Sequence, residues 1–373
     1  MKIISNIARV LTGLVFIFSG FVKGVDPMGT AYRIEDYFVA YGMSWAEPLS
    51  LSLSVILCAI EFALGVYLLL NLKPKITSWG SLLLMIYFTV LTFFDALFNT
   101  VPDCGCFGDF LKLGNWETFY KNIVLISLAI VIFIYRKKFR SPYRPPIANI
   151  LLILIPVGFL YFSMNSLRHL PPLEFTSWKT GNKMMPDSIQ PTQTYLSYKN
   201  KTTGEKKVFL SKDLPWQDSV WMANWVFDTT RIVDPNIYPA PNFNILDTAG
   251  GNHTRAFMKT HDYLIFLVAV DLSQAKPKHL QKLDQFYKDA SKAGYQVIGL
   301  TASIKDDIKK YSQNLGVSVP FYNTDDKELR TMIRSNPGIV LLKNARVTKK
   351  WHFRDIPAIS DFEREFPLNK STN

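Results

Sequence analysis

Five long apolar segments dominate the first half of the chain and limit what it can fold into. Each is long enough to cross a hydrocarbon core about 30 Å thick as a single α-helix. The first contains Arg9, and no Ala-x-Ala cleavage site follows it, so we interpret it as a retained signal anchor. The five predicted spans are about Ile3–Lys23, Pro48–Leu70, Ile76–Phe98, Thr118–Tyr135 and Ile147–Ser166.

The remaining half has the composition of a water-soluble domain. The 373-residue chain is 48% hydrophobic and 19% charged, but from about residue 170 polar and apolar positions alternate. A chain of this length is expected to hold two domains. Its net charge of +12 does not indicate nucleic-acid binding, because Lys and Arg also accumulate in the cytoplasmic loops of membrane proteins.

The charged loops predict the orientation in the membrane. Lys73 and Lys75 lie in the loop after the second span, and the loop after the fourth span reads RKKFRSPYR. Residues 24–47 instead carry four acids against Arg33. The positive-inside rule therefore places the N-terminus and the two basic loops in the cytoplasm. Five crossings then predict a bacterial inner-membrane protein whose C-terminal half is periplasmic.

The stretch PDCGCFGDF, residues 102–110, holds two of the three cysteines and lies between spans three and four. On the oxidising periplasmic side a disulfide between Cys104 and Cys106 can form and persist. Gly105 permits the sharp bend that this small ring needs. We expect such a ring to be strained and readily reduced, and it would constrain little of the unfolded chain. Cys104 and Cys106 are therefore candidate catalytic thiols.

Two other interpretations apply to the Cys104–Cys106 pair, and a separate one applies to Cys58. The bridge could be a permanent disulfide that only shapes its loop. Metal binding by the pair alone is disfavoured, because no second pair of Cys or His ligands lies nearby, and no metal is expected. Cys58, inside the second span, is interpreted as a small packing residue.

Ionisable residues inside the predicted spans are costly and usually face a partner or a cavity. Arg9 and Glu61 are expected about 9 and 14 Å above the inner ends of their helices, so an Arg9–Glu61 pair is feasible. Lys23, Asp95 and Lys121 fall near the outer end, close to the cysteine loop. A lysine beside a cysteine would favour the thiolate; the alternative is that both lysines extend to the membrane surface.

The membrane half resembles the DoxX-like superfamily, and its MauE branch in particular. The resemblance rests on RVLTGLVFIFSGFVKGVDP, CAIEFALGVYLLL and PDCGCFGDFLKLGNWETFYKNIVLI. It implies a four-helix membrane bundle over residues 1–140, thiol or quinone redox work, and a role in maturation of periplasmic proteins. It places Glu61, Cys104, Cys106 and Lys121 at motif positions and makes a quinone a candidate cofactor. Residues 141–169 would form a fifth transmembrane helix.

The C-terminal half is expected to begin with a linker and a small β-hairpin over residues 170–237, where TYLSYKNKTTGEKKVFL alternates around a turn. Residues 238–373 then read as a βαβ unit, from YLIFLVAV through YQVIGLTA, followed by a hairpin of GIVLL and VTKKWHF. This pattern resembles the thioredoxin fold of TlpA-like and peroxiredoxin-like domains. The resemblance implies a cis peptide bond before Pro337.

The C-terminal domain departs from redox thioredoxins at one decisive place. Where they carry Cys-x-x-Cys this chain reads AVDLSQAKPKH, and no cysteine follows Cys106. Without a thiolate this domain cannot exchange disulfides by itself, so we interpret it as a docking module for a periplasmic protein partner. The chain is thus predicted to be a thiol–disulfide oxidoreductase component; the alternative is a non-enzymatic membrane scaffold with a static disulfide.

Overall fold

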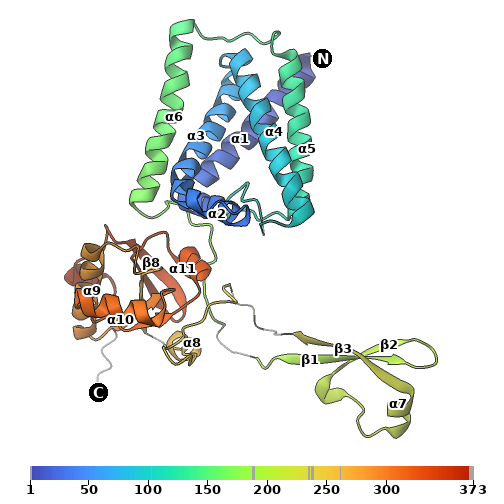
Figure 1. The fold of residues 1–373 in the computed structure, drawn as a ribbon, viewed down its shortest axis with the longest axis vertical. Coiled ribbons are helices and arrows are strands. Elements are labelled where there is room, and N and C mark those ends of the chain that lie inside the picture. Colours follow the sequence, from blue (N-terminus) through green and yellow to red (C-terminus); the bar gives the residue numbers. More distant parts are fainter. Residues whose placement is uncertain are drawn as a thin grey trace.

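Five long helices form the membrane half of the molecule. The structure is a computed structural model that describes residues 2–101, 103–186, 190–233, 236, 239–260 and 262–368 (Figure 1). Within these residues five helices are long and apolar enough to cross a membrane, which confirms the number and order of the predicted spans. They are α1 (Lys2–Val25), α3 (Ser50–Leu70), α4 (Pro74–Phe98), α5 (Asn115–Tyr135) and α6 (Pro145–Arg168).

Helices α1 and α3 pack closely because glycines lie between them. A Cβ atom added to Gly20 would lie 2.6 Å from the backbone nitrogen of Phe62. A Cβ atom on Gly65 would lie 2.6 Å from the backbone nitrogen of Ile17. Small residues allow such close backbone approach between transmembrane helices. The contact fixes the register, with the C-terminal part of α1 beside the middle of α3.

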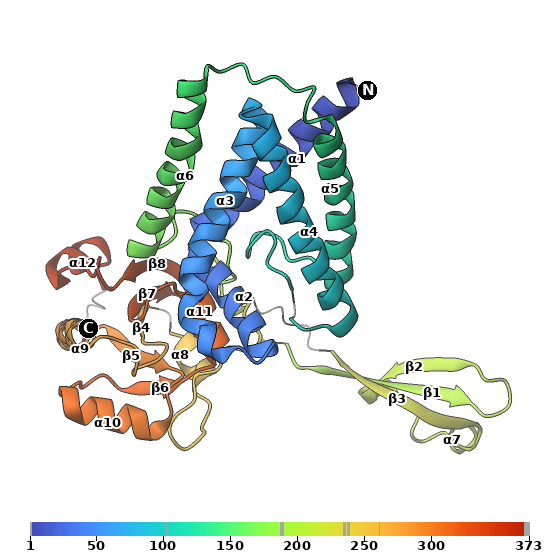
Figure 2. The ribbon, with the colours of Figure 1, turned by 45° about the horizontal axis from the view of Figure 1, so that its top comes forward.

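A further helix, α2 (Pro27–Ala40), lies across the end of the bundle that faces the C-terminal domain (Figure 2). Asp26 caps it by accepting a hydrogen bond from the backbone nitrogen of Gly29 at 3.0 Å, and Pro27 occupies the favoured first helical position. The short 3₁₀-helix η1 (Ser44–Leu49) then leads into α3. Neither helix is predicted from the sequence. Together they lie between the helix bundle and the C-terminal domain.

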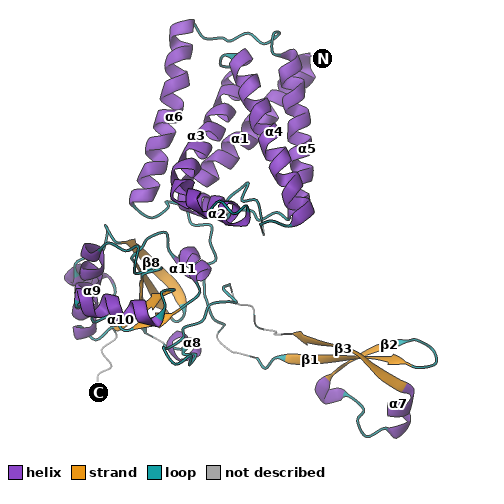
Figure 3. Cartoon of the chain, viewed as in Figure 1, coloured by secondary structure: helices purple, strands orange, loops and turns teal. Residues whose placement is uncertain are grey.

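Among the described residues, every strand follows α6 in the chain (Figure 3). One sheet has the strand order β6-β5-β4-β7-β8. The predicted parallel pairing of β4 with β5 and the predicted antiparallel hairpin of β7 and β8 are both confirmed. The Asn336–Pro337 peptide bond is cis, as the resemblance implied. The strands are β4 (Tyr263–Val268), β5 (Gln296–Thr301), β6 (Phe321–Asn323), β7 (Gly338–Lys343) and β8 (Arg346–His352).

Helices cover both faces of this sheet. Alternate residues of β4 point to opposite faces, so Ile265 packs with one cluster and Phe266 with the other. The first cluster lies under α9 (Pro277–Lys292), α10 (Lys305–Leu315) and α12 (Ile359–Glu365). The second lies under α8 (Thr254–Met258) and α11 (Asp326–Met332). The helix α11 is placed beside the membrane half, where it meets α2.

A three-stranded sheet projects from the body of the molecule as an arm (Figures 1 and 2). Its strand order is β2-β1-β3, and both pairings are antiparallel. The sequence predicts two strands here. The structure adds a third strand, whose residues pair with β1 after a short helix. Trp221 and Trp225 stack with ring centroids 5.6 Å apart within the arm's own small core. The elements are β1 (Gln193–Asn200), β2 (Lys206–Leu210), η2 (Ser211–Asp213), α7 (Ser219–Asn224) and β3 (Trp225–Val233).

Candidate functional site

Cys104 and Cys106 form a disulfide in the loop between α4 and α5, and their Cα atoms are 5.5 Å apart. Gly105 between them has a φ of +61°, in the left-handed region that a side chain disfavours. The backbone nitrogen of Gly108 donates to the carbonyl oxygen of Gly105 at 2.9 Å and closes the turn. Both cysteines are partly exposed. The disulfide is thus held in a compact turn that solvent can reach.

The membrane half supports this turn from two sides. On α1, Ser19 donates a hydrogen bond to the carbonyl oxygen of Cys106 at 2.5 Å. On α2, Arg33 reaches Asp103 with an Nη2–Oδ2 distance of 2.9 Å. The other carboxylate oxygen of Asp103 accepts a hydrogen bond from the backbone nitrogen of Gly105 at 3.1 Å. Side chains of α1 and α2 therefore hold the loop at Cys106 and at Asp103, the residue before Cys104.

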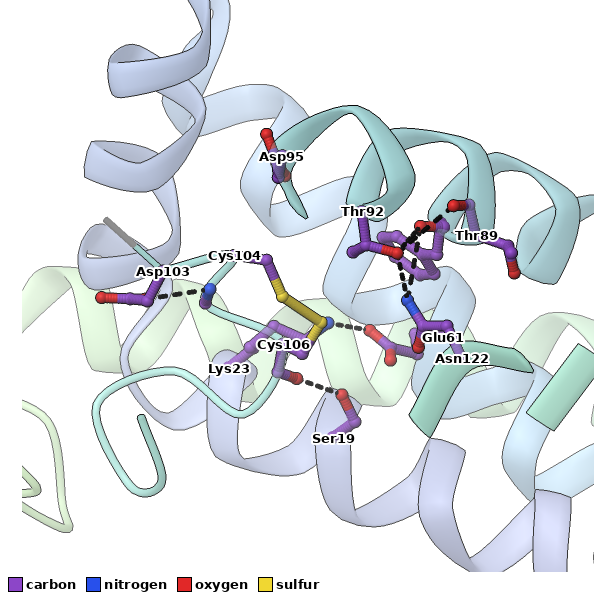
Figure 4. The surroundings of a disulfide bond; sticks show 12 residues. Ser19, Lys23, Glu61, Thr89, Thr92, Asp95, Asp103, Cys104, Cys106 and Asn122 are labelled. Carbon is purple, nitrogen blue, oxygen red and sulfur yellow. Dashed lines mark hydrogen bonds and ion pairs between the residues drawn. A yellow bond between two sulfur atoms is a disulfide. The ribbon is translucent and has the colours of Figure 1, made fainter. Parts of the chain in front are cut away.

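A buried ion pair lies in the surroundings of the disulfide (Figure 4). Lys23 of α1 pairs with Glu61 of α3, and their side chains are only 4% and 6% exposed. The loop packs on this lysine, since a Cβ atom on Gly108 would lie 4.0 Å from Lys23 Cγ. Lys121 places its ammonium group 4.6 Å from the centroid of the Phe107 ring and interacts electrostatically with Lys23 and Glu61. Lys23 thus pairs directly with Glu61, and Lys121 lies within electrostatic range of both. The excess positive charge would favour a cysteine thiolate.

Arg9 and Asp95 have partners that the sequence did not predict. The expected Arg9–Glu61 pair is wrong: Glu61 binds Lys23, and Arg9 donates to the carbonyl oxygens of Leu68 and Leu69, the latter at 3.0 Å. The close packing of α1 on α3 puts Arg9 beside the end of α3 and beyond the reach of Glu61. Asp95 accepts a hydrogen bond from the Tyr37 hydroxyl at 2.5 Å, and so anchors α2 to α4.

The C-terminal domain contacts the same loop. Arg334, just after α11, binds Asp26 with an Nε–Oδ2 distance of 2.8 Å and Asp109 with an Nη2–Oδ2 distance of 2.6 Å. Arg330 binds Glu35 of α2 at 2.7 Å. Asp109 lies three residues after Cys106, so one of these ion pairs ends on the cysteine loop itself.

An aromatic ring lies at the centre of this contact. The guanidinium carbons of Arg330 and Arg334 lie 4.5 and 5.5 Å from the centroid of the Tyr32 ring. Burial raises the pKa of Tyr32 to about 12, so its hydroxyl stays neutral. Burial alone would lower the pKa of Arg334, but the carboxylates of Asp26 and Asp109 raise it overall. A cleft of about 280 Å³ remains between α2 and α11 and reaches Arg33.

The sequence predicted Cys104 and Cys106 as candidate thiols, with four charged residues beside them, but it did not predict the residues that hold the loop. The four are Lys23, Glu61, Asp95 and Lys121. Asp103 and Asp109 carry a local signal, because they flank the cysteines in PDCGCFGDF. Arg33 also has one, since it is the single basic residue in residues 24–47. Arg334 lies 225 positions from its partner Asp109, and no local pattern marks it.

Comparison with known proteins follows the division of the chain. Residues 1–135 match the family model described as methylamine utilisation protein MauE. The chain is 29% identical over 133 residues to Protein TlpB of Flavobacterium psychrophilum, and the alignment covers 35% of this chain and 36% of TlpB. It therefore spans about a third of the length of this curated relative.

A solved structure is also similar to part of the chain. It is the solution structure of a provisionally assigned protein disulfide isomerase from Bacteroides thetaiotaomicron, at 14% identity and a TM-score of 0.27. The similarity covers 34% of this chain and 83% of that one. The five apolar helices and the family match describe a membrane protein whose first 135 residues are similar to the MauE family.

Proposed function

We propose that this chain is a membrane-embedded component of thiol–disulfide exchange that supports maturation of exported proteins. The observation that carries the proposal is the partly exposed Cys104–Cys106 disulfide beside the buried Lys23–Glu61 pair. A solvent-accessible disulfide next to excess positive charge is suited to exchange, because the leaving sulfur departs as a thiolate.

The exchange uses one partner dithiol. A partner thiolate attacks one sulfur of the disulfide, forms a mixed disulfide with it and releases the other sulfur as a thiolate. A second partner thiolate then displaces the first cysteine and leaves the partner oxidised. Two electrons pass to Cys104 and Cys106, and two protons convert their thiolates to thiols. Lys23 and Lys121 stabilise the thiolate formed in the first step. The reverse sequence would reduce a partner disulfide.

A quinone is the cofactor that the family resemblance implies. Lys23 is paired with Glu61, and Asn122 donates to Thr92 at 3.0 Å and to the carbonyl oxygen of Phe88 at 3.3 Å. The ammonium group of Lys121 contacts the Phe107 ring and would be the donor to a quinone carbonyl oxygen. The oxidant or reductant in this proposal is a protein thiol pair, because the exchange balances with that pair alone.

The proposal includes an orientation and a division of labour along the chain. The α3–α4 turn and the α5–α6 loop, which carry the basic residues, lie at the end of the bundle opposite to the C-terminal domain (Figure 1). This sidedness supports a cytoplasmic N-terminus and a periplasmic disulfide loop in a bacterial inner membrane. We propose that residues 1–140, 141–169, 170–237 and 238–373 are the functional parts of the chain. The protein partner docks on the C-terminal domain away from α11, because Arg330 and Arg334 are engaged with the membrane half.

Thiol trapping in cells tests the proposal. Cells expressing a Cys58→Ala variant are quenched with acid and labelled with a large maleimide, so that each reduced thiol of Cys104 and Cys106 retards the band. We expect a mixture of reduced and oxidised protein, shifted toward the reduced form in a strain without disulfide-forming enzymes. A pair that stays oxidised in both strains would overturn the exchange function and favour the scaffold with a static disulfide.

A further inference from the structure

Two arginines hold the disulfide loop at its two ends, and they come from different parts of the molecule. Arg33, on α2 of the membrane half, binds Asp103 immediately before Cys104. Arg334, in the C-terminal domain, binds Asp109 three residues after Cys106. Between these two ion pairs the loop makes its turn at Gly105. The C-terminal domain, which has no cysteine, therefore forms an ion pair with the loop that carries Cys104 and Cys106.

The Arg334 side chain is built into its position. It is 8% exposed, and the Tyr32 ring lies 5.5 Å from its guanidinium carbon. Its three nitrogens are directed to three acceptors: Asp26, Asp109 and the carbonyl oxygen of Arg330. A planar guanidinium presents its donors in a fixed fork, so it can join two carboxylates with a defined separation. Arg334 thus ties the cysteine loop to Asp26 at the start of α2.

We propose that Arg334 is a positioning residue for disulfide exchange: through Asp109 it keeps the loop closed and holds Cys104 and Cys106 at bonding separation. The proposal rests on the exchange function and extends it by giving the C-terminal domain a direct role. This domain then sets the redox equilibrium of a disulfide that it does not contain.

The physical reason is conformational entropy. When the disulfide is reduced, a free loop gains many backbone conformations, and this gain favours the dithiol form. A loop held at Asp103 and at Asp109 gains far fewer, so reclosure of the disulfide stays favourable. Loss of the Arg334 contact would release the C-terminal end of the loop and shift the equilibrium toward the dithiol.

The experiment measures this equilibrium on the full-length protein in detergent. Cys58→Ala protein is equilibrated with mixtures of reduced and oxidised glutathione, quenched with acid and labelled with maleimide. We expect Arg334→Gln to raise the equilibrium constant for reduction about threefold to tenfold, because the C-terminal end of the reduced loop then gains conformational freedom. Arg334→Lys should give an intermediate value, because an ammonium group retains the charge but lacks the fork.

Arg330→Gln is the matched control. It also removes an ion pair between the C-terminal domain and α2, but its partner is Glu35 and not the cysteine loop. We expect its redox equilibrium to equal that of the parent protein. An equal shift in both variants would overturn the proposal, since the effect would then come from general loosening of the domain.

A double-mutant cycle tests the route through Asp109. Asp109→Asn should reproduce the effect of Arg334→Gln, and the double variant should shift the equilibrium no further than either single variant. Additive effects, or no effect of Arg334→Gln, would overturn the proposal. If Arg334→Gln does not yield folded protein, Arg334→Lys with Asp109→Asn provides the same comparison. These are equilibrium measurements on purified protein, so they can fail while trapping in cells still shows cycling, and the reverse also holds.

Discussion

The ammonium group of Lys23 and the carboxylate of Glu61 form an ion pair inside the helix bundle, in the surroundings of the Cys104–Cys106 disulfide (Figure 4). Both side chains are almost completely buried, so each charge depends on the other for compensation. Taking two charges out of water is expensive, and the cost is recovered only while both partners are present. The pair therefore links the stability of the bundle to the chemistry proposed beside it.

Removal of one member of this pair should destabilise the protein strongly. In Glu61→Gln the Lys23 ammonium group stays buried without a carboxylate, and we expect a loss of about 3–5 kcal/mol in the free energy of unfolding. The double variant Lys23→Met/Glu61→Met should be more stable than Glu61→Gln, because the Lys23 ammonium group is no longer buried without its carboxylate. Unfolding of the purified proteins in detergent measures both values. A double variant that is no more stable than Glu61→Gln would contradict this reading of the pair.

Substitution of Gly105 should disturb the disulfide turn. In Gly105→Ala the residue must keep a φ of +61°, which costs about 1–2 kcal/mol for a residue with a side chain. Its Cβ atom would also lie 2.9 Å from Arg33 Cγ. We expect a larger reduced fraction of Cys104 and Cys106 at a given glutathione ratio.

Gly204→Ala is the matched control for this substitution. Gly204 has a φ of +72° in the turn between β1 and β2, and a Cβ atom there would meet only Lys199 Cε, at 3.8 Å. This variant carries a similar backbone cost far from the disulfide. Its reduced fraction should equal that of the parent, and an equal rise in both variants would show that the turn at Gly105 is not specifically required.

The stability of the C-terminal domain should fall in mild acid because of His352. Burial, assisted by the nearby Arg354 charge, lowers the pKa of His352 from 6.5 to about 4. Below pH 6.5 His352 is mostly protonated in the unfolded chain. In the folded domain it becomes protonated only near pH 4. The unfolded state therefore binds more protons, and stability decreases as the pH falls through this window.

The size of this effect can be isolated by substitution. Between pH 6.5 and 5 the His352 contribution should cost about 2 kcal/mol, and His352→Gln should remove that part of the pH dependence while keeping an acceptor for the backbone nitrogen of Arg354. His253→Gln, a partly exposed histidine on the same domain, serves as the control. Thermal midpoints measured from pH 7 to pH 4.5 would show a parallel decline in parent and His352→Gln if the interpretation is wrong.

The features that were predictable from the sequence depend on long or uninterrupted local patterns. The spans were visible because a bilayer requires about 20 apolar residues in a row, and β4 was visible because all six of its residues are buried. The helix α2 has only 14 residues and mixed polarity, and β6 has only three. Short elements of this kind are stabilised by packing against neighbouring elements. Their own sequence does not show this packing.

Side-chain partners were harder to predict than elements. The expected Arg9–Glu61 pair was derived by comparing the depth of each residue above the inner end of its own helix. The backbone contact at Gly20 sets a different register and brings Lys23 to Glu61. The contact of Arg334 with Asp109 joins two domains, and its existence depends on how they pack. Local patterns contain the cysteines, but the groups that hold them come from the assembled tertiary structure.

The sequence separation between Asp109 and Arg334 has a consequence for biosynthesis. At about 5–20 residues per second, the ribosome needs about 10 to 45 s to add the 225 residues between them. Throughout this interval the cysteine loop of the nascent chain lacks the contact between Asp109 and Arg334. An oxidase that closes the sulfur bridge would find its easiest access during these seconds, before translation delivers the arginine that completes the enclosure.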